Sequence, residues 1–299
     1  MELNPPSDDV LRAFGLAGPA SHLAGGEARC FRAGGAVLKR ADDDDESQKV
    51  AEMVTLLLGK LSPASLYRLP RPMAAVKNAG TYIQGGWTAS QYIHGKEGPK
   101  DHFRDILRIC KALHDDLSSI SSQPPAFIGK RTNRWSQADR VTWGEMDVNP
   151  VPGINHEILA HLASPLEQLK QMKRELPTVP AEQLIHADLT GNVLFSQDGE
   201  LPTVIDITLY WRPAEYAGAV IVADGLTWFG EGRRLVEAYG TDELHLQYLV
   251  RALFWRCLTF AIDHDPQWIR DTVPIEGFLG ANRVVKEVMH DMEQAKEAT

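Results

Sequence analysis

The sequence has few of the features that mark secreted, zinc-binding or nucleic-acid-binding proteins. Its three cysteines, Cys30, Cys110 and Cys257, are far apart and show no CxxC or Cys/His spacing, so we expect reduced structural thiols and neither a disulfide framework nor a zinc site. Asp and Glu number 40 against 31 Lys and Arg, a formal net charge of -9. Because binding a polyanion needs a basic face, no general nucleic-acid partner is expected.

Long apolar runs are missing as well. The most apolar stretch, AGAVIVA at residues 217–223, is stopped by Asp224 and is far too short to span a bilayer. The N-terminal MELNPPSDDVLRAFGL has no basic segment followed by an apolar core, so we expect no signal peptide. These absences predict a cytoplasmic protein with no membrane contact, and no obligate protein partner is evident.

The patterns that are present change character along the chain. Residues before about 94 contain short strand-like runs separated by the pairs Gly25-Gly26 and Gly34-Gly35, with one helical pattern at residues 47–61. From Asp101 onward most segments have a helical period. The sequence therefore predicts a β-rich lobe at residues 1–94 and a larger, mainly helical lobe at residues 95–299.

The segment LIHADLTGNVLF carries the polar residues that point most clearly to chemistry. His186, Asp188 and Asn192 stand in a short loop before a strand, and a second predicted strand ends near Asp206. If the two strands form a hairpin, Asn192 and Asp206 lie together with Asp188 beside them. Carboxylate and amide oxygens suit Mg²⁺, and a further carboxylate can accept a proton from an attacking hydroxyl.

Parts that phosphoryl transfer would need occur earlier in the chain, in the expected order. Backbone N–H groups at Gly25 and Gly26 are placed to approach a triphosphate, although a plain hairpin turn explains these glycines equally well. Lys39 ends a strand and can contact the α- and β-phosphates. A helix acid would orient this lysine, with Glu52 as the first candidate and Glu46 as the alternative.

With these residues in place, the sequence resembles the aminoglycoside phosphotransferase and choline kinase family. IHADLTGNVLF followed by VIDITLYWRP is similar to the H-G-D-x-x-x-x-N and I-D-W/F signatures of that family. VLK and GGWTASQYIHG extend the similarity over most of the chain. Within the family, the HxDLTGNVLF and YWRP segments are most like those of an uncharacterised actinobacterial branch. The resemblance implies an α+β, bilobal protein-kinase-like fold, and transfer of the γ-phosphoryl group of ATP, with Mg²⁺, to a hydroxyl of a small molecule.

The resemblance also implies roles for individual residues. Asp188 would be the catalytic base. His186 belongs to the same catalytic motif, where such a histidine more often orients the loop backbone than transfers protons. Asn192 and Asp206 would bind the metal, and Lys39 with Glu52 would form the phosphate-binding ion pair. The backbone of Ser90, Gln91 and Tyr92 would meet the adenine. Asp224, opening a helix after residues 217–223, would brace the catalytic loop by accepting hydrogen bonds from its backbone N–H groups.

Two departures from the family pattern leave alternatives open. Asp188 and Asn192 are four positions apart where the family has five, a spacing that Thr190-Gly191 permits by a tighter turn. Ile207 and LYWRP replace the residues usual in the family, so we expect the acceptor-binding part of the site to differ from that of familiar members. The excess of acidic residues after residue 210 favours a cationic acceptor. The alternatives are a nucleotide-binding pseudokinase with a regulatory role, or an enzyme that transfers AMP instead of phosphate.

Overall fold

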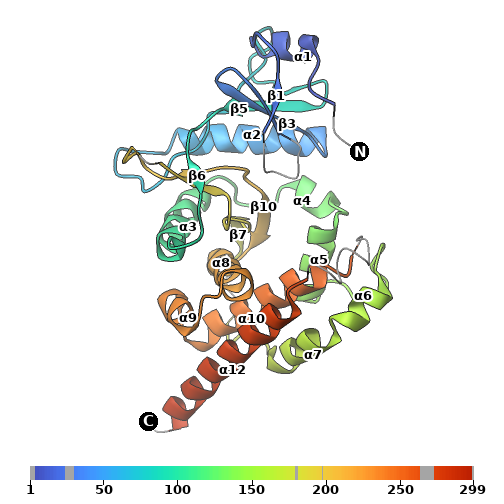
Figure 1. Ribbon diagram of the computed structural model, residues 1–299, viewed down its shortest axis with the longest axis vertical. Helices are drawn as coiled ribbons and strands as arrows, with labels where there is room; N and C mark the ends of the chain where they lie inside the picture. Colours follow the sequence, from blue (N-terminus) through green and yellow to red (C-terminus); the bar gives the residue numbers. More distant parts are fainter. Residues whose placement is uncertain (1–3, 24–29, 179–180, 197, 263–272, 298–299) are drawn as a thin grey trace. The chain divides into compact units, whose positions relative to one another are not determined.

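The computed structural model describes residues 4–23, 30–178, 181–196, 198–262 and 273–297. The chain forms two compact units, whose elements are labelled in Figure 1. The first combines Met1–Gly98 with the later segments Asp115–Ser122 and Gly191–Leu209, and the second comprises Pro99–His114, Gln123–Thr190 and Tyr210–Thr299. The segment that carries Asn192 and Asp206 therefore belongs to the unit that begins the chain.

A five-stranded antiparallel sheet forms the first unit's framework. Its strands, in spatial order, are β1 (Ser21–His22), β2 (Cys30–Ala33), β3 (Ala36–Arg40), β5 (Trp87–Gln91) and β4 (Ile83–Gln84). Gly34-Gly35 joins β2 to β3 as the predicted hairpin turn, and Gly34 has a φ of +58°, a conformation that glycine adopts without steric cost. Phe31, Leu38 and Trp87 from the sheet pack with side chains of α1 (Asp8–Ala13) in one apolar cluster.

The acidic run at residues 42–46 leads into the helix that the sequence predicts. Helix α2 (Asp44–Leu58) begins where the Asp43 carboxylate accepts a hydrogen bond from the Glu46 N–H at 2.8 Å. Acidic side chains in this first turn also suit the positive end of the helix dipole. Val54 and Leu57 are its buried side chains, so the helix keeps its polar face, including Glu52, toward solvent.

A second, three-stranded sheet completes the first unit. It has the order β6-β8-β9, formed by β6 (Lys96–Glu97), β8 (Val193–Phe195) and β9 (Thr203–Val204). Val193 pairs with Val204 in an antiparallel register, which confirms the predicted hairpin. Asp206 follows β9 with a φ of +51°, and extended backbone resumes at β10 (Leu209–Arg212).

The second unit is mainly helical. Strands β7 (Gln183–His186) and β10 pair in its small sheet. Helices α8, α10 and α12 pack on one another, and α7 packs on α10 and α12 (Figure 1). The helices are α3 (Phe103–Leu117), α4 (Ala126–Lys130), α5 (Arg134–Trp143), α6 (His156–His161), α7 (Ala163–Met172), α8 (Ala214–Trp228), α9 (Arg233–Tyr239), α10 (Glu243–Thr259) and α12 (Ile275–Glu297).

The predicted start of a helix at Asp224 is wrong. The apolar run at residues 217–223 lies inside α8, and Asp224 is in the last turns of the same helix. Every residue of α8 from Tyr216 to Thr227 is buried. A helix that is buried on all sides has no polar face, so its sequence lacks the period by which a surface helix is recognised.

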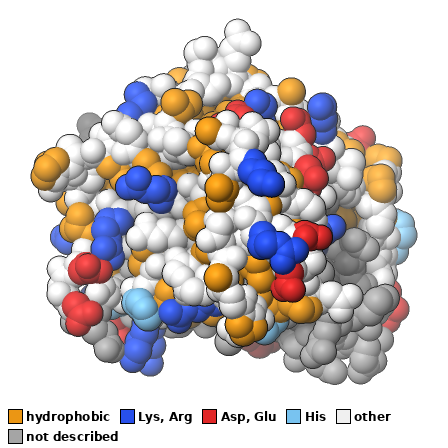
Figure 2. All heavy atoms as spheres, turned by 90° about the horizontal axis from the view of Figure 1, so that it is seen from above, with side chains coloured by type: hydrophobic (Ala, Val, Ile, Leu, Met, Phe, Trp, Pro, Cys, Tyr) orange, Lys and Arg blue, Asp and Glu red, His pale blue; other side chains and the backbone are white. Residues whose placement is uncertain are grey.

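Among the described residues, no helix is long and apolar enough to cross a membrane. Cys30, Cys110 and Cys257 are free thiols, and burial raises the pKa of Cys110 and of Cys257. On the face seen in Figure 2, the basic side chains are scattered among apolar, acidic and uncharged groups. That face does not form a continuous basic surface.

Candidate active site

The loop after β7 is tied to helix α3 through two histidines. The His186 N–H donates to Nε2 of His114 at 3.0 Å, and Nδ1 of His114 lies 2.6 Å from the Cys110 carbonyl oxygen. Nε2 must therefore be the unprotonated nitrogen of His114, with the proton on Nδ1 donated to Cys110. The His186 side chain has an exposed fraction of 0%. This burial favours the orienting role for His186 over direct proton transfer.

Asp188 is held by an arginine that the sequence analysis did not single out. Its side chain is 43% exposed, and its Oδ1 accepts from Nη2 of Arg256 at 2.7 Å. The same guanidinium binds Asp224 through Nε–Oδ1 and Nη2–Oδ2 contacts, each of 2.8 Å. Asp224 thus connects to the catalytic loop through Arg256, where a direct bond to loop N–H groups was expected.

The sequence did contain a signal for this arginine. Arg251 and Arg256 both lie within the apolar run LHLQYLVRALFWRCLTF of α10. Charged side chains in a buried helix require partners, because an unpaired buried charge is strongly unfavourable. Burial raises the pKa of Asp224, and the Arg256 guanidinium opposes that effect. We take the pair as ionised, because the bidentate contact favours both charges.

Asn192 and Asp206 are brought together by the β8–β9 pairing. The Asn192 carbonyl accepts a hydrogen bond from the Ile205 N–H at 2.9 Å, one position before Asp206. Gly191 has a φ of +85°, which lets the short Thr190-Gly191 segment turn tightly. Two hard oxygen donors at the end of one hairpin fit Mg²⁺, which takes few protein ligands and keeps waters and phosphates in its shell.

Lys39 and Glu52 do not form the expected ion pair in the described contacts. Nζ of Lys39 contacts Oδ1 of Asp206, and both side chains are 38% exposed. Glu52 instead accepts from Gln48 Nε2 at 2.8 Å and from Lys49 Nζ at 2.9 Å on its own helix. These two local hydrogen bonds lower the pKa of Glu52. Glu52 is satisfied within α2, so Lys39 is oriented by a metal-ligand candidate and not by a helix acid.

The remaining nucleotide-binding candidates have different outcomes. Gly25 and Gly26 lie outside the described residues. The Gln91 N–H donates to the Arg71 carbonyl at 2.9 Å, and the Tyr92 N–H donates to the Gly35 carbonyl at 2.8 Å. An adenine at Ser90 to Tyr92 would therefore have to use groups other than these two N–H donors.

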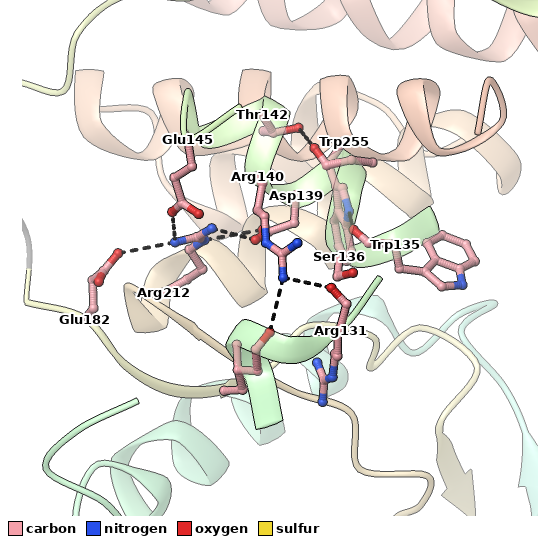
Figure 3. A network of polar contacts seen from close by, with 12 residues as sticks. Arg131, Trp135, Ser136, Asp139, Arg140, Thr142, Glu145, Glu182, Arg212 and Trp255 are labelled. Carbon is pink, nitrogen blue, oxygen red and sulfur yellow. Dashed lines mark hydrogen bonds and ion pairs between the residues drawn. The ribbon is translucent and has the colours of Figure 1, made fainter. Parts of the chain in front are cut away.

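The second unit also contains a polar pocket of about 240 Å³. Arg212 lines it, and Figure 3 shows this side chain among Glu145, Glu182 and Asp139. Nη2 of Arg212 lies 2.6 Å from Oδ2 of buried Asp139, while its Nη1 lies 2.7 Å from Glu145 and 3.6 Å from Glu182. Glu145 and Glu182 are 47% and 41% exposed, so two carboxylates reach solvent beside one guanidinium.

The pocket is connected to the Asp188 loop through aromatic packing within the second unit. Tyr210, which lines the pocket, packs edge-on against Trp255 with ring centres 5.5 Å apart. Trp255 directly precedes Arg256. Burial raises the pKa of Tyr210, so its phenol stays protonated at neutral pH. All three residues of the YWR segment line the pocket, and Tyr210 is also buried against Trp255.

Comparison with solved structures defines the fold. The aminoglycoside phosphotransferase of Alicyclobacillus acidocaldarius covers 100% of this chain and 98% of its own, with a TM-score of 0.60 and 12% identity. A spectinomycin phosphotransferase bound to ADP and spectinomycin covers 96% and 97%, with a TM-score of 0.54 and 15% identity. Amicoumacin kinase with AMP-PNP, Ca²⁺ and its substrate covers 91% and 88%, at a TM-score of 0.52 and 13% identity. The α+β, protein-kinase-like fold is therefore confirmed.

Family membership rests on the sequence itself. The model of the phosphotransferase enzyme family matches residues 23–210, which include Lys39, Asp188, Asn192 and Asp206. The chain belongs to this family. No curated protein matches the sequence.

Proposed function

We propose that this protein transfers the γ-phosphoryl group of ATP, with Mg²⁺, to a hydroxyl of a small molecule. The observation that carries the proposal is the contact between Lys39 and Asp206, which are 167 positions apart in the sequence. Both belong to the first unit, where the backbone of Asn192 pairs with Ile205, the residue before Asp206. A cation, a carboxylate and an amide at one place suit a metal-bound polyphosphate. The family match and the nucleotides bound to the similar structures support the same activity.

In this reaction each residue has a separate task. Asp188 accepts the proton of the acceptor hydroxyl as its oxygen bonds to the γ-phosphorus, and the bond from that phosphorus to the β–γ bridging oxygen breaks to release ADP. Lys39 binds phosphate oxygens. Asn192 and Asp206 would hold Mg²⁺, which neutralises phosphate charge when bound.

The pocket around Arg212 is the proposed acceptor site. It belongs to the same unit as Asp188 and adjoins it through Tyr210, Trp255 and Arg256. Glu145 and Glu182 are half exposed, and the lining also contains Asp139 and the guanidiniums of Arg131, Arg140 and Arg212. Charges of both signs suit a polar acceptor with hydroxyl groups, and the acidic balance of the whole chain favours one that also carries amino groups.

The test is Mg²⁺-dependent ADP release from ATP, measured with a panel of aminoglycosides, amino sugars, cholines and nucleosides. We expect at least one acceptor to stimulate release and to gain one phosphate by mass spectrometry. Pyrophosphate release would instead indicate AMP transfer. ATP binding without turnover on any acceptor would contradict the proposal and favour a pseudokinase.

Variants of Lys39 and Glu52 distinguish the two possible lysine partners. Lys39→Met should raise the KM for ATP by roughly 10-fold or more, because a charge-assisted phosphate contact contributes about 1.5–3 kcal/mol. Glu52→Gln should change it less than about 2-fold, because an exposed ion pair contributes little. Equal losses in both variants, in steady-state kinetics, would show that Lys39 depends on Glu52 during turnover.

A further inference from the structure

We infer that Arg256 is a positioning residue that fixes the carboxylate of Asp188 in its working orientation. The inference rests on the proposed function, because it gives Arg256 a part in the same reaction. The residue lies on α10, 68 positions along the chain from Asp188.

The hydrogen bonds of Arg256 leave little freedom for its guanidinium. Nε and Nη2 grip the two oxygens of Asp224 at 2.8 Å each, and Nη2 also donates to Asp188 Oδ1 at 2.7 Å. The side chains of Arg256 and Asp224 are 7% and 6% exposed, whereas that of Asp188 is 43% exposed. A buried ion pair therefore holds the half-exposed carboxylate of Asp188 through a charge-assisted hydrogen bond.

Aromatic rings fix the guanidinium further. Its central carbon lies 4.8 Å from the ring centre of Trp255 and 5.7 Å from that of Trp135. The Trp255 indole N–H donates to the Trp135 carbonyl at 2.9 Å, so the two rings are themselves held in place. Arg256 is thus constrained by α5, α8 and α10 together, and Asp188 inherits that constraint.

This constraint matters because Asp188 must meet an acceptor oxygen in a defined direction. A half-exposed aspartate in a loop samples several rotamers, and misplacement of a catalytic group by about 1 Å can cost about 100-fold in rate. The contribution of Arg256 is therefore expected in kcat, which depends on the orientation of the base. ATP affinity depends on Lys39 and the metal ligands, so it should not change.

The test compares Arg256→Lys with Arg251→Lys in Mg²⁺-dependent ADP release. Arg251 is the matched control: it is buried on the same helix and donates to the Gln247 and Arg174 carbonyls, at 3.1 and 2.8 Å. Lysine keeps the charge but cannot hold Asp224 and Asp188 with one planar group. We expect kcat to fall about 10- to 100-fold in Arg256→Lys, with the KM for ATP changed less than 2-fold, and no comparable fall in Arg251→Lys.

A second comparison shows whether the effect passes through Asp188. In an Asp188→Ala background, adding Arg256→Lys should cost less than about 3-fold, because the group to be positioned is gone. If Arg256→Lys does not fold, Asp224→Asn takes its place, since it loosens the anchor with little change of shape. Equal kcat losses in both arginine variants, or full additivity with Asp188→Ala, would overturn the inference. An inactive wild type would refute the proposed function instead.

Discussion

Replacing Asp188 by Asn should lower kcat by about 100- to 10,000-fold, the range expected when a general base is lost. Asparagine has nearly the same shape and still presents an oxygen to Nη2 of Arg256, the contact that measures 2.7 Å in the native protein. Its amide, however, cannot take up the proton of the acceptor hydroxyl. The loss should therefore be confined to the chemical step.

The measurement is steady-state ADP release with the best acceptor of the panel, beside ATP binding by calorimetry. Asp105→Asn is the control, since Asp105 is also an exposed aspartate, with a side chain 49% exposed that pairs with Arg108 on the surface of α3. We expect this control to behave as the wild type. Turnover within 3-fold of wild type in Asp188→Asn would remove Asp188 from the role of base.

Replacing Arg212 by Met should have the largest effect on stability. The Arg212 and Asp139 side chains are 9% and 8% exposed, with Nη2–Oδ2 and Nε–Oδ1 contacts of 2.6 and 3.3 Å. Removing the arginine leaves a buried carboxylate without its cation. Such a change costs about 3–5 kcal/mol, which in a protein of this size lowers the melting temperature by roughly 10 °C.

A matched surface variant and a double variant make this result specific. Arg233 also pairs with two carboxylates, those of Glu237 and Asp291, but its side chain is 47% exposed. Arg233→Met should therefore change stability by less than about 1 kcal/mol. Asp139→Leu combined with Arg212→Met should recover much of the loss, because no lone charge remains. A melting temperature unchanged in Arg212→Met, by circular dichroism, would show that the pair is not a stabilising element.

Local sequence patterns predicted those parts of the site that depend on neighbouring residues. The Gly34-Gly35 turn, the helix in the region of α2 and the β8–β9 hairpin all follow from short-range signals. The hairpin in turn brought Asn192 beside Asp206. Resemblance to a family supplied the fold, which spacing alone would not have given.

Contacts between distant segments could not be predicted in the same way. Arg212 meets Asp139 across 73 positions, and Arg256 meets Asp188 across 68, with no pattern in the sequence to pair them. For a related reason, the structure gives Lys39 a partner other than the expected Glu52. Glu52 has suitable residues one turn away on its own helix, and such local pairs compete with any distant one.

The discontinuous first unit sets the order in which the protein can acquire its structure. Residues up to Gly98 are synthesised early, yet the Arg68 N–H donates to the Pro202 carbonyl and the Arg68 carbonyl accepts from Val204 N–H, at 2.8 and 2.9 Å. Strand β6 likewise has only β8 as its partner among the described strands. At a translation rate of about 5–20 residues per second, these edges remain unpaired for many seconds after they emerge. A nascent chain that ends before residue 206 thus carries Lys39 without Asp206, and its exposed strand edges are natural targets for chaperones.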